Sequence, residues 1–303
     1  MNTTAQKEQV KSSTSHSGSS SEIASTALWK AELELTLALV REQTRLIACR
    51  HEGPLRVQKP FVQDDGSCHI YLLHPPGGLV GGDQLSINAH AEAETHTVFT
   101  SPSAGKFYRS NDREQRMSVT LNVGANAHLE WLPMETIVFD DAQALIDTRV
   151  VLAEDASFLG WEVLCLGRRA SGEKFDRGRV RQQTRIDRAG RLLHRECLET
   201  SQEWRLGAWG MNSASVVGTL IAVLIPTGKI KDEAQTKLLV DVLRAAVDDP
   251  KLAVTHKACT ILVRYLGDSA ERCRELFETV RDLLHESHCF AHQGSERPRI
   301  WKT

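Results

Sequence analysis

The densest group of side chains able to bind a metal lies near the C-terminal end of the chain. The stretch "HESHCFAH" places His285, His288, Cys289 and His292 at spacings of three and four residues. This spacing would bring several of them to one face of a helix, and imidazole and thiolate ligands suit zinc, nickel and copper. A structural interpretation is also open, because the helix dipole favours histidine near the C-terminal end of a helix. The four residues are therefore candidate metal ligands.

Two acidic residues stand alone in strongly apolar stretches. Glu162 lies in "FLGWEVLCLG" and Glu196 lies in "RLLHRECLE". A buried carboxylate needs a hydrogen-bonding partner, a proton or a metal ion, whereas the two-residue period of a strand could equally turn each side chain to solvent. The pair Asp140 and Asp141 in "IVFDDAQA" is typical of a turn. Together with Glu162, this pair supports an alternative function, a β-rich hydrolase or lyase that uses these carboxylates for acid–base chemistry.

The motifs do not support nucleotide binding or nucleophilic catalysis. In "SPSAGKFYRS", Gly105 and Lys106 resemble part of a P-loop, but Phe107 stands where serine or threonine is required and the leading glycine is missing. The stretch "PPGGLVGGD" is followed by strand-like sequence rather than by the helix of a dinucleotide fingerprint. Cys68 and His69 would point to opposite faces of a strand, and the G-x-S-x-G motif is absent. We therefore expect neither a bound nucleotide nor a nucleophilic triad.

The segment "HIYLLHPPGGLVGGDQL" (69–85) combines prolines, glycines and one carboxylate. Pro75 and Pro76 would end the preceding strand, because proline cannot donate a ladder hydrogen bond. The four glycines that follow permit a turn in which two backbone segments approach closely. Asp83 then begins the next strand, where a turn-capping role and a role for its charge both remain open.

The composition is that of an ordinary protein without a strong charge bias. The chain has 303 residues, 41% of them hydrophobic, and a formal charge of −2, which favours binding to neither nucleic acid nor a membrane surface. No apolar stretch approaches the ~20 residues needed to span a bilayer. Residues 1–27 are rich in serine and threonine and lack the apolar core of a secretory signal, so we predict a disordered N-terminal extension. Seven cysteines without a C-x-x-C pair indicate reduced thiols and a cytoplasmic location.

Alternation of apolar and polar residues dominates the remaining chain, residues 28–303. It begins at Trp29 and recurs in "LSINAHAEA", "THTVFTS", "MSVTLNV", "AHLEWL", "TRVVLAED" and "RVRQQTRI". A period of two residues indicates half-buried strands. We predict a mainly β fold in which antiparallel or stacked sheets form one β-rich body, with a further strand in "CTILVRYLG".

Two stretches in the last third have helical spacing instead. We predict one helix within 231–249 and one within 268–287, the second with Asp268 and Glu271 as a capping pair. The apolar stripe of the first comprises Leu238, Leu239, Val242, Leu243 and Ala246, and that of the second comprises Cys273, Leu276, Phe277, Val280 and Leu284. Both helices are expected to pack on the β-rich body.

Six blocks of sequence occur in the order seen in one protein family. They are "GPLRVQKPF" (53–61), "LLHPPGGLVGGD" (72–83), "SPSAGKFYRS" (101–110), "LEWLPMETIVFD" (129–140), "WEVLCLGRRASGEKF" (161–175) and "PRIWKT" (298–303). On these blocks the chain resembles the urease accessory protein UreD family, called UreH in some organisms, from about Trp29 to Thr303. "HESHCFAH" lies in a stretch that varies within the family, so the resemblance assigns no role to its histidines.

The resemblance implies a non-catalytic scaffold, mostly β with two helices, that is required for the insertion of nickel into apo-urease. Such proteins bind apo-urease on one side and UreF on the other, and UreF receives UreG, the GTPase that brings nickel. The resemblance implies no tightly bound cofactor, only nickel in transit, along a passage lined by the positions of Asp83, Glu162 and Glu196. Spaced single carboxylates suit transit, because nickel accepts oxygen ligands and conduction requires several weak sites.

Overall fold

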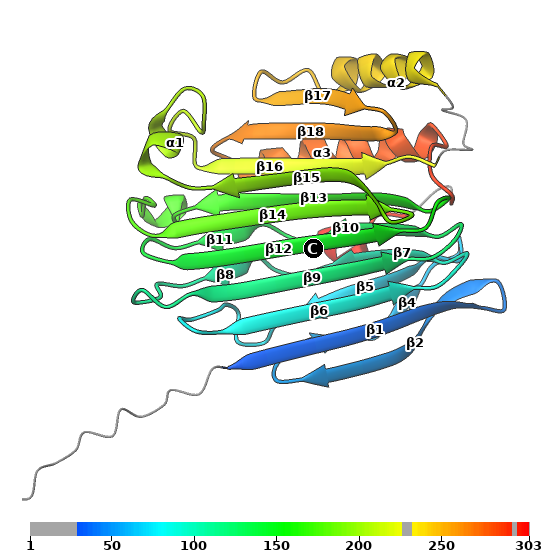
Figure 1. Ribbon diagram of the computed structural model, residues 1–303, viewed down its shortest axis with the longest axis horizontal. Helices are drawn as coiled ribbons and strands as arrows, with labels where there is room; N and C mark the ends of the chain where they lie inside the picture. Colours follow the sequence, from blue (N-terminus) through cyan, green and yellow to red (C-terminus); the bar gives the residue numbers. More distant parts are fainter. Residues whose placement is uncertain (1–28, 226–231, 293–295, 303) are drawn as a thin grey trace, which may run out of the picture.

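The described part of the chain forms two stacked β-sheets. In the computed structural model these are residues 29–225, 232–292 and 296–302, so the predicted N-terminal extension, 1–27, lies outside the described residues. Figure 1 shows the seven-stranded sheet in front of the eleven-stranded sheet, with α2 beside β17 and α3 behind β16 and β18. The predicted fold class, mainly β with stacked sheets and two helices in the C-terminal half, is confirmed.

The strands divide between the sheets as follows. The seven-stranded sheet has the order β15 (Arg191–Glu199), β14 (Arg179–Arg188), β12 (Gln143–Leu152), β9 (Gln115–Val123), β6 (Gln84–Ala91), β1 (Lys30–Val40) and β2 (Gln43–Glu52). The eleven-stranded sheet has the order β17 (Leu252–Lys257), β18 (Thr260–Gly267), β16 (Val216–Val223), β13 (Ser157–Leu166), β10 (His128–Leu132), β7 (His96–Thr100), β5 (Cys68–Leu73) and β3 (Arg56–Val57), with β4 (Phe61–Val62), β8 (Gly105–Phe107) and β11 (Thr136–Val138) off this path.

The chain alternates between the two sheets, and this alternation determines strand direction. β6, β9 and β12 lie in the first sheet, and the strands β7, β10 and β13 lie in the second. Each strand that the chain adds to a sheet therefore has the same direction as the strand before it in that sheet. The neighbours in β1–β6–β9–β12–β14 and in β5–β7–β10–β13 are accordingly parallel. The expected antiparallel pairing is restricted to the ends of the sheets, as in β1–β2, β14–β15 and β16–β18. Alternation in a sequence records the face that a side chain takes but not the direction of the strand.

Apolar side chains fill two layers. One lies between the sheets, where the inward leucines of β1, such as Leu33 and Leu37, are fully buried. The other lies between the eleven-stranded sheet and the two long helices, and it includes Val98 and Leu159. β7 and β10 are consequently buried on both faces. Any polar side chain on these two strands must therefore find its partners inside the protein.

The two predicted helices are α2 (Glu233–Ala246) and α3 (Ala270–Glu286), and a short α1 (Gln202–Leu206) was not predicted. α3 buries its entire predicted stripe. In α2, however, Leu238 and Val242 are exposed, and Thr236 and Val240 are buried instead. The apolar surface of α2 is wider than its contact with β17, so packing decides which part is covered. No helix of the described residues is long and apolar enough to cross a membrane.

The predicted cap of α3 is displaced by one residue. Ser269, rather than Asp268, is the N-cap, and its hydroxyl accepts a hydrogen bond from the backbone N–H of Arg272 at 3.1 Å. Asp268 instead accepts hydrogen bonds from Arg169 and from Ser215. Its carboxylate therefore joins the start of α3 to the segment before β16.

The glycine-rich turn after Pro76 brings two backbone segments together. A Cβ atom on Gly78 would lie 2.9 Å from the carbonyl oxygen of Lys106, and a Cβ on Gly81 would overlap the carbonyl oxygen of Ser110. Glycine is thus required here by close backbone approach. The turn and the segment around β8 consequently form one packed rim at this end of the stack.

Candidate functional site

A large cavity lies between the two sheets. Its volume is about 450 Å³, and apolar side chains of both sheets line it, Ile87 and Phe99 among them. Its rim consists of parts of the segments 74–79, 101–106 and 133–136, and exposed proline and serine side chains show that the rim reaches the surface. Three of the sequence blocks quoted above therefore meet at the mouth of this cavity.

A much smaller cavity lies beyond Trp131. It has a volume of about 20 Å³, which leaves room for about one water molecule. Its lining includes the polar side chains of Thr148, Gln182, Thr184 and Thr219 together with the carboxylates of Glu162 and Glu196. Trp131 lines both cavities, so its indole lies at the boundary between the apolar space and the acidic one.

Glu162 of β13 makes its contacts in the interior. Its Oε1 accepts hydrogen bonds from Trp131 Nε1 and from Thr148 Oγ1, both at 3.2 Å. Burial, reinforced by the nearby charge of Glu196 and opposed by these hydrogen bonds, raises the pKa of Glu162 from 4.5 to about 7. The carboxyl group therefore gains and loses a proton near neutral pH, and its charged form can take up a cation.

Glu196 of β15 connects the two sheets. Its Oε2 accepts a hydrogen bond from Arg264 Nη2 of β18 at 2.5 Å, and His194 Nε2 lies 3.2 Å from the same oxygen. Burial alone would raise the pKa of Glu196, but the contacts with His194 and Arg264 hold it below its usual value. Glu196 is thus charged at neutral pH, in contrast to Glu162.

Asp83 lies apart from the small cavity, at the edge of the large one. Its side chain is almost fully buried, and Oδ2 accepts a hydrogen bond from the backbone N–H of Val80 at 2.8 Å. Leu79 and Leu85, which flank this turn, line the large cavity, whereas Asp83 lines neither cavity. The contact is that of a turn cap, and it brings the carboxylate close to the rim.

Asp140 and Asp141, the carboxylates of the alternative function, hold a turn. Oδ1 of Asp140 accepts hydrogen bonds from the backbone N–H groups of Asp176 and Arg177, at 2.9 and 2.7 Å. Although burial opposes it, these hydrogen bonds lower the pKa of Asp140. Asp141 has a φ of 67°, as expected for a tight turn. The contacts of this pair are with a neighbouring loop, while those of Glu162 are with side chains of the interior.

Two of the predicted metal ligands lie beside other histidines. His285, in the last turn of α3, is buried, and its Nε2 lies 3.3 Å from Glu130 Oε1. His292 stacks on His96 with 5.4 Å between the ring centroids. Both side chains thus contact β7 or β10 of the eleven-stranded sheet.

The other two predicted ligands have different surroundings. The thiol of Cys289 donates a hydrogen bond to the Leu284 carbonyl at 3.1 Å, and burial raises its pKa to about 12. His288 follows the end of α3 with a φ of 53°. The four residues as a set remain a prediction, and their contacts place His285 and His292 in a different environment from Cys289.

Sequence reasoning missed three residues next to His285. His96, His128 and Glu130 offer ligand atoms that all lie within 4.8 Å of one another, and within the described ranges they are the one such group of three or more. His96 and His128 are paired in register on β7 and β10. A signal exists, because "THTVF" and "AHLEW" each carry a histidine near the start of a strand. These two histidines can be recognised as neighbours only once the parallel pairing of their strands is known.

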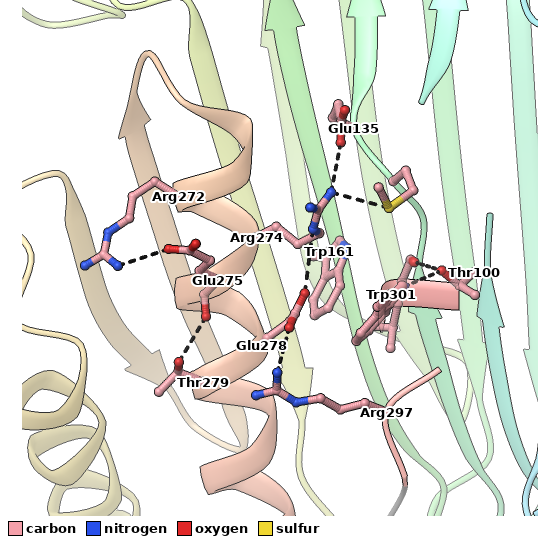
Figure 2. Close-up of polar contacts among 12 residues, drawn as sticks. Thr100, Glu135, Trp161, Arg272, Arg274, Glu275, Glu278, Thr279, Arg297 and Trp301 are labelled. Atoms are coloured by element: carbon pink, nitrogen blue, oxygen red, sulfur yellow. Dashed lines mark hydrogen bonds and ion pairs between the residues drawn. The ribbon is translucent and has the colours of Figure 1, made fainter. Parts of the chain in front are cut away.

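The C-terminal segment packs on the same face of the sheet as α3 (Figure 2). In η2 (Arg299–Lys302), Trp301 lies against Trp161 with ring centroids 5.5 Å apart, and its Nε1 donates to Thr100 Oγ1 at 3.1 Å. Arg274 of α3 reaches Glu135 Oε2 at 3.4 Å. These contacts hold the segment 133–136, and with it one side of the large cavity's rim.

Comparison with known proteins assigns the family. Residues 30–302 match the family model described as UreD urease accessory protein. The chain belongs to the UreD family. Relatives named urease accessory protein UreD include those of Saccharophagus degradans, 39% identical over 285 residues that cover 92% of this chain and 95% of the relative, and of Dechloromonas aromatica, 38% identical over 280 residues that cover 91% and 95%. The relative from Acinetobacter baumannii is 34% identical over 284 residues that cover 92% and 96%. Membership of the UreD family supports a role in urease maturation, and the description as an accessory protein suggests that this role is non-catalytic.

Proposed function

We propose that this protein is a cytoplasmic scaffold through which nickel is inserted into apo-urease. It acts in a complex with UreF and the GTPase UreG on the structural subunits of urease, binds no cofactor tightly, and catalyses no reaction itself. The observation that carries the proposal is the pair of carboxylates, Glu162 and Glu196, in the interior between the sheets, next to a cavity that reaches the surface. Family membership points to urease, and the interior carboxylates offer a route for a cation.

The two carboxylates suit transit because their charges differ. Glu196 stays charged beside Arg264, whereas Glu162 carries a proton at pH values below about 7. A nickel ion that reaches Glu162 replaces this proton, so the interior gains one positive charge rather than two while the ion passes. Oxygen ligands from one carboxylate at a time hold nickel weakly, which favours release. Asp83 acts earlier on this route, from the turn beside the rim of the large cavity.

The test measures nickel delivery after each charge has been removed. Glu162→Gln, Glu196→Gln and Asp83→Asn keep the size of the side chain and abolish the carboxylate. Each variant is co-expressed with UreF, UreG and apo-urease at limiting nickel. Nickel per urease active site is then measured together with the yield of the pulled-down complex. We expect unchanged complex yield and lower nickel content, with less than additive effects when the substitutions are combined.

Asp140→Asn is the matched control. It removes the same charge, but Asp140 caps a loop with an oxygen that asparagine retains. We expect it to load nickel normally. Full nickel loading with all three passage carboxylates neutralised would refute the carboxylate route. Loss of the complex would instead show that these residues hold an interface.

A further inference from the structure

We propose that His96, His128, Glu130 and His285 form a binding site for a divalent transition-metal ion of the nickel–zinc class. Three of these residues lie on β7 and β10, and His285 lies on α3, which covers this face of the eleven-stranded sheet (Figure 1). Trp131, the neighbour of Glu130, points to the cavities, so Glu130 points to the opposite face. The site is therefore separate from the proposed nickel route, and the inference does not rest on the proposed function.

The three imidazoles surround one oxygen of Glu130, and the ligand atoms of His96, His128 and Glu130 also lie within 4.8 Å of one another, a group that does not include His285. The Nε2 atoms of His285, His96 and His128 lie 3.3, 3.5 and 4.0 Å from Oε1 of Glu130. These separations are close to those between neighbouring ligands of a metal ion with bonds of about 2.0–2.2 Å. Three imidazoles and one carboxylate are a ligand set that zinc, nickel and cobalt all accept. Small rotations of the rings would complete such a site.

Buried nitrogen atoms that lack a well-formed hydrogen bond favour a ligand here. The Nε2 atoms of His96, His128 and His285 are enclosed, and the contact that each makes with Glu130 Oε1 lacks the geometry of a hydrogen bond. The three side chains are between 0% and 6% exposed. Enclosed polar atoms of this kind destabilise a fold unless something satisfies them. A metal ion held between His96, His128 and Glu130 would take up the lone pairs of two of these nitrogens, and a rotation of the His285 ring would bring in the third.

The surroundings hold the rings in place. The Nδ1 atom of His128 lies 2.8 Å from Ser157 Oγ, which also accepts a hydrogen bond from the backbone N–H of Ala291. When His128 donates from Nδ1 to this hydroxyl, the lone pair of its Nε2 faces Glu130. Such an outer contact is what fixes the tautomer of a histidine that binds a metal. Partly exposed His292 stacks on His96, so an imidazole that solvent can reach adjoins the site.

The net charge of the site favours a metal ion that exchanges with solvent. Both oxygens of Glu130 accept hydrogen bonds from the fully buried Arg281, so the carboxylate already neutralises one positive charge. Each carboxylate oxygen has a further lone pair that can reach a metal ion. A divalent ion would nevertheless add net positive charge to the interior, which weakens binding relative to a structural zinc site. We therefore expect an ion that binds and dissociates.

Cobalt titration of the isolated protein tests the inference. The full chain, with any affinity tag removed, is titrated with Co²⁺, and the visible d–d absorption reports the number and geometry of bound ions. We expect one ion per chain with nitrogen and oxygen ligands, displaced by Zn²⁺ or Ni²⁺. His96→Gln and His128→Gln should each weaken binding at least about tenfold.

Three variants serve as matched controls. His69→Gln changes a buried histidine on β5 that also lacks a partner but lies outside the ligand group. His288→Gln and Cys289→Ser change the other residues of the helix-end set predicted from sequence. All three should bind cobalt like the wild type. Far-ultraviolet circular dichroism without metal tests whether each variant is folded. If His96→Gln or His128→Gln fails to fold, His285→Gln takes its place.

Two results would overturn the inference. The first is a wild-type protein that shows no stoichiometric d–d signal, which is decisive without any variant. The second is a signal that persists in His96→Gln and His128→Gln or disappears in Cys289→Ser, which would move the site to the end of α3. Either result leaves the proposed nickel route untouched, because that route is tested by nickel in urease.

Discussion

Replacing Glu162 by glutamine should make the protein more stable at alkaline pH. In the wild type, burial raises the pKa of this carboxyl group from 4.5 to about 7. Between these pH values the folded protein holds a proton that the unfolded chain has released, so stability falls as the pH rises. Glutamine carries no charge at any pH. It can accept the hydrogen bonds from Trp131 and Thr148 without this penalty.

The size of the effect follows from the two pKa values. The difference between 4.5 and about 7 corresponds to about 3.4 kcal/mol of lost stability once the pH is well above 7. At about pH 5.5 the same relation gives a loss of about 1.4 kcal/mol. The advantage of Glu162→Gln over the wild type should thus grow by about 2 kcal/mol between about pH 5.5 and about pH 8.5. Because the side chain is only partly buried, we expect no more than this.

Urea unfolding followed by tryptophan fluorescence measures this difference at both pH values. Taking variant minus wild type cancels the titration of all groups that the two proteins share. Glu196→Gln is the control, because contacts with His194 and Arg264 lower the pKa of Glu196, so its charge stabilises the fold. This variant should be less stable than the wild type at both pH values. A difference for Glu162→Gln that stays constant or shrinks as the pH rises would refute the burial of this carboxyl group.

Three further predictions concern stability at neutral pH and use the same unfolding assay. Gly81→Ala should cost about 2 kcal/mol, because the new methyl group would overlap the Ser110 carbonyl oxygen; a change below about 0.5 kcal/mol would contradict the close approach. Trp301→Ala should cost about 3 kcal/mol through the lost packing on Trp161, and unchanged stability would mean that the C-terminal segment does not stay docked. Asp83→Asn should change stability by less than about 0.5 kcal/mol, since an amide oxygen can accept the same loop N–H, and a larger loss would show that the charge itself holds the turn.

Local patterns in the chain predicted its strands and helices well, because they depend on neighbours close in sequence. The alternation from Trp29 marks β1, and the spacing of Cys273 to Leu284 marks the buried face of α3. The same patterns could not predict that the central strands are parallel. They also misplaced the buried face of α2, where Leu238 is exposed. Strand direction and the buried face of a helix both depend on which element packs against them in the folded protein.

The sequence alone marked Glu162 and Glu196 as unusual, since a lone carboxylate among large apolar residues needs a partner. Only the tertiary structure decided that both border one small cavity, because they belong to opposite sheets. It also decided that His96 and His128, 32 positions apart, lie side by side on parallel strands in register, with His285 brought to them by α3. Composition and spacing describe one segment at a time. Side chains from distant segments come together only when the strands stack into two sheets and a helix packs over them.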